Sequence, residues 1–313
     1  IKMKMNDLIF KELLKRGYKF EGKTRVWNIA DSKLWYLTPK QAQGYLDLGK
    51  TKGYRESITN KEVFLIKKHL KDFIELLPKK SCNIIDLGCG DGKKALLFIE
   101  ELAKYMKIRY CPIDISSYMV SKAAKTVRAM KIGEVLEFKW NISDFENLDN
   151  ITPLFRDKGF ENHLMMLLGN TLGNFDRDDI LNGIKNSMNE GDVLIIGNGL
   201  SNGHKDWTKE YKDTIINKWL IQVLLQIGLS KEDINYDVRF VDSRVEEIYI
   251  LKKDKTIEHF GRKIDFKKGD IIITAISHKY TKNEFPKILT KFFSRIKMYA
   301  DTENTYALAL CKK

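Results

Sequence analysis

The chain has 313 residues, enough to bury a full hydrophobic core and long for one minimal doubly wound domain, so an insertion or second lobe is expected. Charged residues make up 31% and apolar residues 43%, as in an ordinary soluble globular protein, and no apolar run approaches the roughly 18–20 residues that span a membrane. The formal net charge of +13 would attract polyanions, but the lysines alternate with acidic residues along the chain.

The cysteines and histidines are not spaced for a metal site or a disulfide framework. The four cysteines, Cys82, Cys89, Cys111 and Cys311, lack C-x-x-C spacing, and the five histidines lack the H-x-H and H-E-x-x-H patterns. We therefore expect structural thiols in a reducing compartment and no metal site. The first twenty residues lack the apolar core of a signal peptide, so we expect a cytoplasmic protein.

Helix and strand patterns alternate as far as residue 200. A helix is predicted at 60–77, a buried strand at 83–87 and a helix that ends at Leu102. Further strands are predicted at 109–114, 135–140, 163–168 and 193–197, with helices at 117–130 and 178–188 between them. Such alternation indicates a parallel sheet with right-handed crossovers.

The pattern changes after Gly199. A long helix is predicted at 207–227, an antiparallel meander at 237–241, 245–251, 256–260 and 270–277, and then a helix at 284–293 and a hairpin of strands at 297–300 and 306–310. We assign 60–200 and 278–313 to one α/β domain. Residues 1–59 and 201–277 are expected to form a second, α+β lobe that binds the substrate.

A glycine loop follows the strand at 83–87. Gly88, Gly90 and Gly92 have G-x-G-x-G spacing, and Asp86 lies two residues before the first of them. The dinucleotide fingerprint would need a third glycine at position 93, which is Lys93. The pattern instead resembles motif I of class I S-adenosylmethionine (SAM) methyltransferases, which implies a Rossmann-like sheet that binds SAM at this loop, with Lys93 beside it. The alternative is a chance glycine-rich turn in another doubly wound protein.

Two later positions agree with SAM binding. The strand at 109–114 ends in Asp114, whose carboxylate could accept hydrogen bonds from both ribose hydroxyls. The strand at 135–140 is followed by Asp144 and Phe145, where such enzymes contact the adenine amino group and ring face. Three elements in the right order are a stronger signal than the glycine motif alone.

The strand at 163–168 runs into a loop of sequence Gly-Asn-Thr-Leu-Gly-Asn. It lies at the carboxyl edge of the sheet, where a methyl acceptor must bind. Gly169 permits close approach, and Thr171 and Asn174 supply hydrogen-bonding groups. The alternative is a helix-capping loop in which Asn174 or Asp176 only begins the next helix.

Four segments in one order extend the resemblance over most of the chain. They are Lys-Leu-Trp-Tyr at 33–36, Gly-Tyr-Arg-Glu-Ser at 53–57, the 169–174 loop and Ile-Thr-Ala-Ile-Ser-His-Lys-Tyr at 273–280. Together they resemble the histidine N-alpha-methyltransferase family of ergothioneine biosynthesis, whose relatives include an N-methyltransferase of a tryptophan derivative. The resemblance implies two lobes and SAM-dependent methylation of the α-amino group of a free amino acid.

The resemblance also implies roles for single residues. Asn174 would orient the amino group, and Tyr54 and Tyr211 would hold the carboxylate, with Tyr36 lining the cleft. Gly169 and Thr171 would shape the transfer site, and Ser277 would face the substrate side chain. Because no lysine or histidine is obviously placed as a base, we expect the amine to lose its proton to water or through Tyr36. Each tyrosine has an alternative role, because aromatic residues most often fill cores.

One position departs from the family. Its imidazole-binding strand has Glu two residues before the serine, where this chain has Ala275, while Glu247 occupies an apolar position of the neighbouring strand. If Glu247 points into the pocket, a polar or cationic side chain could be bound. If it points to solvent, as most glutamates do and as we expect, the pocket suits a larger aromatic side chain and histidine binds poorly.

Other classes of function stay open. The basic surface could serve a SAM-dependent RNA or protein methyltransferase, and a non-catalytic SAM-binding or nucleic-acid-binding module is a further alternative. No basic run is interleaved with stacking aromatic residues, which argues against RNA. We expect a small amino-acid substrate, no membrane partner, and a monomer or weak dimer.

Overall fold

The computed structural model describes residues 6–77, 80–203 and 206–313. The chain divides into two compact units. One, the α/β unit, comprises Gly49–Lys205 and Lys279–Lys313, and the other, the second unit, comprises Ile1–Leu48 and Asp206–His278. Residues 49–59 and 201–205 thus fall within the α/β unit, whereas our assignment placed them in the substrate lobe. Among the described residues, no helix is both long and apolar enough to cross a membrane.

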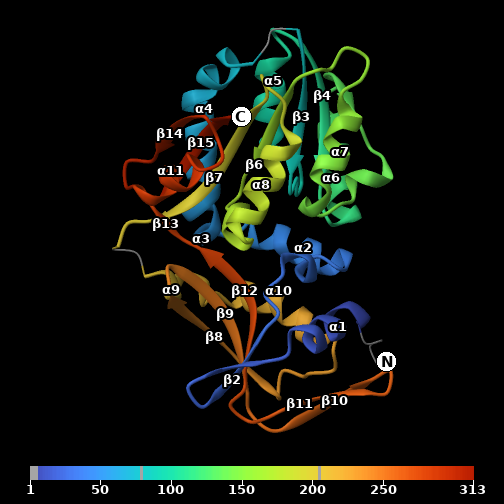
Figure 1. Ribbon diagram of the computed structural model, residues 1–313, viewed down its shortest axis with the longest axis vertical. Helices are drawn as coiled ribbons and strands as arrows, with labels where there is room; N and C mark the ends of the chain where they lie inside the picture. Colours follow the sequence, from blue (N-terminus) through green and yellow to red (C-terminus); the bar gives the residue numbers. More distant parts are fainter. Residues whose placement is uncertain (1–5, 78–79, 204–205) are drawn as a thin grey trace. The chain divides into compact units, whose positions relative to one another are not determined.

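The α/β unit contains one mixed sheet (Figure 1). Its strands are β3 (Ser81–Leu87), β4 (Lys107–Ile113), β5 (Glu134–Val135), β6 (His163–Leu167), β7 (Val193–Ser201), β13 (Tyr280–Thr281), β14 (Arg295–Ala300) and β15 (Tyr306–Lys312). The strand order is β14-β15-β7-β6-β3-β4-β5, and β13 pairs with β7. The strands from β5 to β7 are parallel, whereas β15 runs antiparallel to β7 and to β14. The predicted parallel sheet with a closing hairpin is therefore confirmed.

Helices cover this sheet. They are α4 (Asn60–Glu75), α5 (Lys93–Leu102), α6 (Ser117–Arg128), α7 (Leu148–Ile151), α8 (Arg177–Ser187) and α11 (Glu284–Leu289), and the short α3 (Lys52–Tyr54) precedes them in the chain. Every residue of β3 and β6 is buried, as expected for central parallel strands with both faces covered. From β3 the chain adds β4 and β5 on one side of the sheet and then β6 and β7 on the other side. Ligands of such folds bind beyond the carboxyl ends of the strands at this switch point, between β3 and β6.

The predicted third strand, 135–140, is wrong in length, because β5 contains only Glu134 and Val135. The side chain of Asn141 ends the pairing. Its amide donates to the carbonyl of Pro112, at 2.6 Å, and its carbonyl oxygen accepts from the N–H of Phe138, at 2.7 Å. Pro112 has no N–H for a longer ladder, so the chain turns into a short 3-10 helix instead.

The described residues of the second unit form a five-stranded sheet, a hairpin and four α-helices. The strands are β1 (Lys19–Glu21), β2 (Thr24–Asn28), β8 (Ile234–Val241), β9 (Arg244–Leu251), β10 (Lys255–His259), β11 (Arg262–Phe266) and β12 (Ile271–His278), and the helices are α1 (Asp7–Arg16), α2 (Pro39–Leu48), α9 (Trp207–Tyr211) and α10 (Thr214–Leu225). The sheet order is β1-β2-β12-β9-β8, with β10-β11 as a separate hairpin.

The amino-terminal segment and the insertion share this sheet because β2 pairs in parallel with β12. Asp270 reinforces the junction, since it forms an ion pair with Arg25 at 2.5 Å and accepts from the Trp27 indole N–H at 3.0 Å. The expected second α+β lobe, built from the amino terminus and the insertion, is therefore confirmed as a fold.

The single helix predicted at 207–227 is wrong, because it is two helices. Lys212 closes α9 through a backbone hydrogen bond to Thr208, and Asp213 caps α10 by accepting from the N–H of Ile215 at 2.7 Å. A side-chain cap of this kind competes with helix continuation. The break leaves Tyr211 at the end of α9.

Candidate functional site

The glycine loop has the conformation that its sequence predicts. Gly88, Gly90 and Gly92 have φ values of +71°, +54° and +73°, which side chains other than glycine rarely adopt. A Cβ on Gly92 would also lie 2.9 Å from the Cα of Ala123, so α5 can begin here only with glycine. The N–H of Gly88 donates to the carbonyl of Ile113 at 2.8 Å and fixes the loop to the end of β4.

Asp114 directly follows β4, and its carboxylate lies against this loop. One oxygen accepts from the N–H of Ser116 at 2.9 Å and the other from the N–H of Gly90 at 3.4 Å. Burial raises the pKa of the carboxyl to about 6. A buried carboxylate held by backbone N–H groups retains lone pairs for the two hydroxyls of a ribose.

Two segments from elsewhere in the sequence lie close to Gly88. A Cβ there would lie 3.6 Å from Oγ1 of Thr171 and 3.8 Å from Cζ of Phe145. Phe145 reaches this place because the chain at 141–143 hydrogen bonds to Asp114 on both sides, Asp114 N–H to Asn141 and Ser143 N–H to Asp114, each at 3.0 Å. The glycine loop, a ribose acceptor and a half-buried aromatic ring together fit the adenosine part of SAM.

The other three predicted cofactor residues, Asp86, Asp144 and Lys93, each interact with a neighbouring side chain of the protein. Asp86 is buried and accepts from the Tyr110 hydroxyl at 2.7 Å, and burial raises its pKa to about 7. Asp144 is half-buried and accepts from the side chain of Asn147 at 2.9 Å. The exposed ammonium of Lys93 pairs with Asp91 at 2.7 Å.

Glu62 of α4 is a site residue that the sequence analysis missed. It is fully buried, accepts hydrogen bonds from the N–H of Gly169, at 2.8 Å, and from the Tyr306 hydroxyl, and forms an ion pair with Lys94 of α5 at 2.5 Å. A Cβ on Gly197 would collide with its carboxylate. A signal was present, since Glu62 lies on the same helix face as Leu65 and Ile66, where an apolar residue is expected.

The loop after β6 forms the short 3-10 helix Thr171–Asn174. Gly169 and Asn170 both have positive φ, and the Asn170 side-chain oxygen accepts from the N–H of Gly199 at 2.8 Å. Asp176, not Asn174, caps α8. Asn174 is half-buried, and its side-chain amide has no hydrogen-bond partner within the part of the chain that the structure describes.

In the second unit, Tyr211 and Ser277 are brought together. The Tyr211 hydroxyl donates to Oγ of Ser277 at 3.2 Å, and the carbonyl of Tyr211 accepts from the hydroxyl of Tyr236 at 2.8 Å. Burial and the negative charge of Glu247 raise the pKa of both tyrosines above the usual value. Glu247 is therefore near this pair.

The expectation that Glu247 faces solvent is wrong, because only 5% of this residue is exposed. It lies on β9, between β8 and β12, and in register with Ala275. Because β9 is an interior strand of the sheet, the covered face to which Glu247 belongs excludes water, even though glutamate is usually a surface residue. A carboxylate thus lies directly across the ladder from the position that lacks one.

The other two predicted tyrosines lie in different surroundings. Tyr36 packs against Tyr45, with ring centroids 5.5 Å apart, and against Trp219, at 5.8 Å. Tyr45 was missed by the sequence analysis, although it also interacts electrostatically with Tyr211. Tyr54 is the half-buried last residue of α3, in the α/β unit.

No cluster of three or more histidine, cysteine or acidic side chains that could hold a metal occurs among the described residues. All four cysteines are buried free thiols, and burial raises the pKa of Cys82 to about 12.

The parallel sheet has a switch point between β3 and β6 and an antiparallel strand, β15. A glycine loop follows β3, and an acidic residue, Asp114, follows β4. This arrangement defines a class I SAM-dependent methyltransferase. The chain belongs to the family of histidine-specific, SAM-dependent methyltransferases, whose family model matches residues 54–313. The resemblance inferred from the sequence is confirmed, as are the enzyme class and SAM as the cofactor.

Individual relatives are distant. The chain is 22% identical over 244 residues to the N-methyltransferase fsqC of Aspergillus fumigatus, which covers 74% of this chain and 65% of that protein. The chain therefore spans less than two thirds of this relative's length. Among solved structures, a SAM-dependent methyltransferase of Clostridium acetobutylicum has 18% identity and a TM-score of 0.43, covering 87% of this chain and 97% of that one. DesVI of Streptomyces venezuelae has 11% identity and a TM-score of 0.39, covering 89% of this chain and 99% of that one.

The position of Glu62 predicts its effect on stability. Glu62→Gln removes a buried charge that neutralises Lys94 and should lower the free energy of unfolding by about 2–4 kcal/mol, measured by urea denaturation. Glu303→Gln is the matched control, because Glu303 pairs with Lys61 at the exposed surface of the same unit. It should change the free energy by less than about 0.5 kcal/mol. Equal losses in the two variants would contradict this role of Glu62.

Proposed function

We propose that this protein transfers a methyl group from SAM to the α-amino nitrogen of a free amino acid or a close derivative. The observation that supports this best is the loop after β6. Thr171 places the loop beside Gly88 of the cofactor loop, and Asn174 at its end offers a side-chain amide that does not cap the next helix. Family membership and similarity to the fungal N-methyltransferase favour nitrogen as the acceptor atom.

Each residue group would have a distinct task. From the α/β unit, Gly88, Gly90, Gly92, Asp114 and Phe145 would bind SAM, which supplies an electrophilic methyl group for in-line attack by an amine lone pair. Asn174 would direct that lone pair along the C–S bond, and alignment of this kind can lower a barrier by several kcal/mol. Asp86, Lys93, Asp144 and Gly169 would support the cofactor pocket, with Tyr54 and Thr171 beside the acceptor.

The amine must be neutral to react, although a free α-amino group is mostly protonated at pH 7. Neutral tyrosine and asparagine groups around it would lower its pKa, because they do not stabilise the cation as a carboxylate would. We propose Tyr36 as the group that passes the proton on, and Tyr211 as a ligand of the substrate carboxylate.

The burial of Glu247 changes the proposed side-chain preference. A carboxylate kept out of water is stable only if it is well partnered, and an N–H or a cation on the substrate would add such a partner. We therefore propose that Glu247 and Ser277 bind an acceptor side chain that has a ring N–H or a positive charge. Histidine then becomes a good candidate, contrary to our first expectation.

The first test is release of S-adenosylhomocysteine with each free amino acid, compared with tRNA and with a protein mixture. Release should occur with at least one free amino acid. Asn174→Ala should lower turnover with that acceptor by about a hundredfold and leave the SAM dissociation constant within about twofold, because Asn174 acts on acceptor geometry. Release with tRNA or protein alone would favour the basic-surface alternative.

The pKa of Asp114 predicts how SAM affinity depends on pH. Ribose hydroxyls donate to the ionised carboxylate, so binding must remove the proton from a group whose folded pKa is about 6. Affinity measured by calorimetry should be constant above pH 7 and fall about tenfold per pH unit below the pKa. Asp114→Asn should weaken binding at pH 7.5 by about tenfold to a hundredfold and remove most of the slope. An unchanged slope in that variant would assign the titration to another group, such as Asp86.

Glu247→Gln tests the side-chain proposal. The variant should raise the KM for histidine by about tenfold or more and leave the KM for phenylalanine nearly unchanged, because phenylalanine offers no N–H to the carboxylate. Steady-state kinetics with both acceptors provide the measurement, and thermal denaturation checks that the variant is folded. Equal KM changes for the two acceptors would remove Glu247 from this role.

A further inference from the structure

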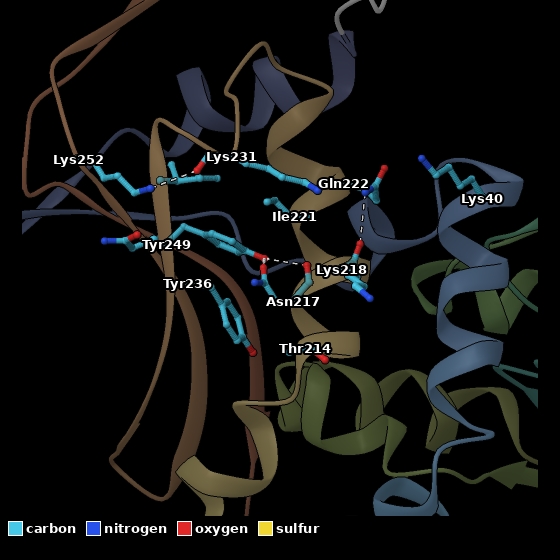
Figure 2. Close-up of a pocket in the computed structure, with 12 residues that line it drawn as sticks. Lys40, Thr214, Asn217, Lys218, Ile221, Gln222, Lys231, Tyr236, Tyr249 and Lys252 are labelled. Carbon is cyan, nitrogen blue, oxygen red and sulfur yellow. Dashed lines mark hydrogen bonds between the residues drawn. The ribbon is translucent and has the colours of Figure 1, made fainter.

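The second unit contains a groove that none of the predicted cofactor or acceptor residues lines (Figure 2). Its volume is about 590 Å³, within the range of small-molecule sites. One side is formed by α10, through Ile221 and Gln222, and the other by the first half of β8 and by Tyr249 of β9.

The inner side of the groove is fixed by hydrogen bonds, and it presents the half-buried ring of Tyr236, which the fully buried Tyr249 supports from behind. Tyr236 and Tyr249 are cross-strand neighbours whose ring centroids lie 5.3 Å apart. The Tyr249 hydroxyl bonds to the side-chain oxygen of Asn217 at 2.9 Å, and the Tyr236 hydroxyl to the carbonyl of Tyr211 at 2.8 Å. Because both hydroxyls are held, the surface is formed before any ligand arrives.

The rim is strongly basic. Four lysines, Lys40, Lys218, Lys231 and Lys252, line the groove, and no aspartate or glutamate does. None of the four has a carboxylate within ion-pair distance among the described residues, and Lys252 donates instead to the carbonyl of Lys231 at 3.3 Å.

Other lysines close by are neutralised. Lys253 and Lys255 both pair with the buried Asp233, at 2.9 and 3.1 Å. Glu232 interacts electrostatically with Lys252, but its side chain is hydrogen bonded to Ser230. Positive charge is therefore concentrated at the groove, although acidic residues occur in the same segment.

We propose that this groove binds a small molecule in which a phosphate group is joined to an aromatic or apolar body. Lysine ammonium groups suit phosphate as point charges, and the half-buried ring of Tyr236 suits an aromatic or apolar group. The lysines come from α2, α10 and two loops around one groove, rather than from a stripe along a surface, which favours a compact anion over a nucleic-acid strand.

Calorimetry on the full chain tests this proposal, with saturating S-adenosylhomocysteine to block the cofactor site. The probes are phenyl phosphate, UMP, uridine and inorganic phosphate. Phenyl phosphate or UMP should bind about tenfold or more tightly than uridine or inorganic phosphate, because both parts of the groove contribute.

Two double variants locate the binding. Lys218→Gln with Lys231→Gln should weaken the better probe about tenfold or more, because two phosphate contacts are lost. Lys19→Gln with Lys23→Gln removes the same charge from an exposed turn of the same unit and should have an effect within about twofold. No binding of either phosphate ester, or equal losses in the two variants, would overturn the proposal. Tighter, steeply salt-dependent binding of a single-stranded oligonucleotide would replace it with a nucleic-acid surface.

Discussion

The carboxylate of Glu62 connects the loop after β6 to two other elements of the α/β unit. It is fully buried in α4, yet it contacts the loop after β6 through Gly169, β15 through Tyr306 and α5 through Lys94. These elements are far apart in sequence and meet at one pair of oxygen atoms. A buried charge is costly unless every lone pair is used, so its partners must stay in place for the fold to be stable. The position of the loop after β6 follows from this constraint.

Two buried acids near the glycine loop carry an energetic cost in the free protein. Asp86 and Asp114 both have raised pKa values because burial disfavours their ionised forms. A ligand that donates hydrogen bonds to the ionised Asp114 would relieve part of this cost. The relief would contribute to the binding free energy of that ligand. Glu247 presents the same physics in the second unit, where burial keeps a carboxylate near Tyr211 and Ser277.

The order of chemically informative residues was predictable from the sequence, because it reflects local rules. A buried strand followed by three glycines, and an acid at the end of the next strand, determine the loop and Asp114 without tertiary information. The end of β5 and the break between α9 and α10 were not predictable in this way. Each depends on one side chain, Asn141 or Asp213, that could equally have been solvated.

The sequence did not predict which way single side chains point or which residues distant in sequence they contact. Glu247 reads as a surface residue until the sheet order places β9 between β8 and β12. Glu62 forms its ion pair with Lys94 of another helix. Tyr45 packs against Tyr36 and lies near Tyr211, which is distant in sequence. Neither set of contacts can be inferred from the local pattern. Pattern reasoning assigns a face to a residue, but not the neighbours that the face will meet.

The most direct test of the proposed chemistry is the atom that receives the methyl group. The enzyme would be incubated with SAM bearing a trideuterated methyl group and with the free amino acid that releases S-adenosylhomocysteine, and the product fragmented by tandem mass spectrometry. The account predicts that the label is on the α-nitrogen, in an ion that retains it after loss of the carboxyl group. Label on a side-chain atom, on the carboxylate, on a nucleobase or on a protein would contradict it.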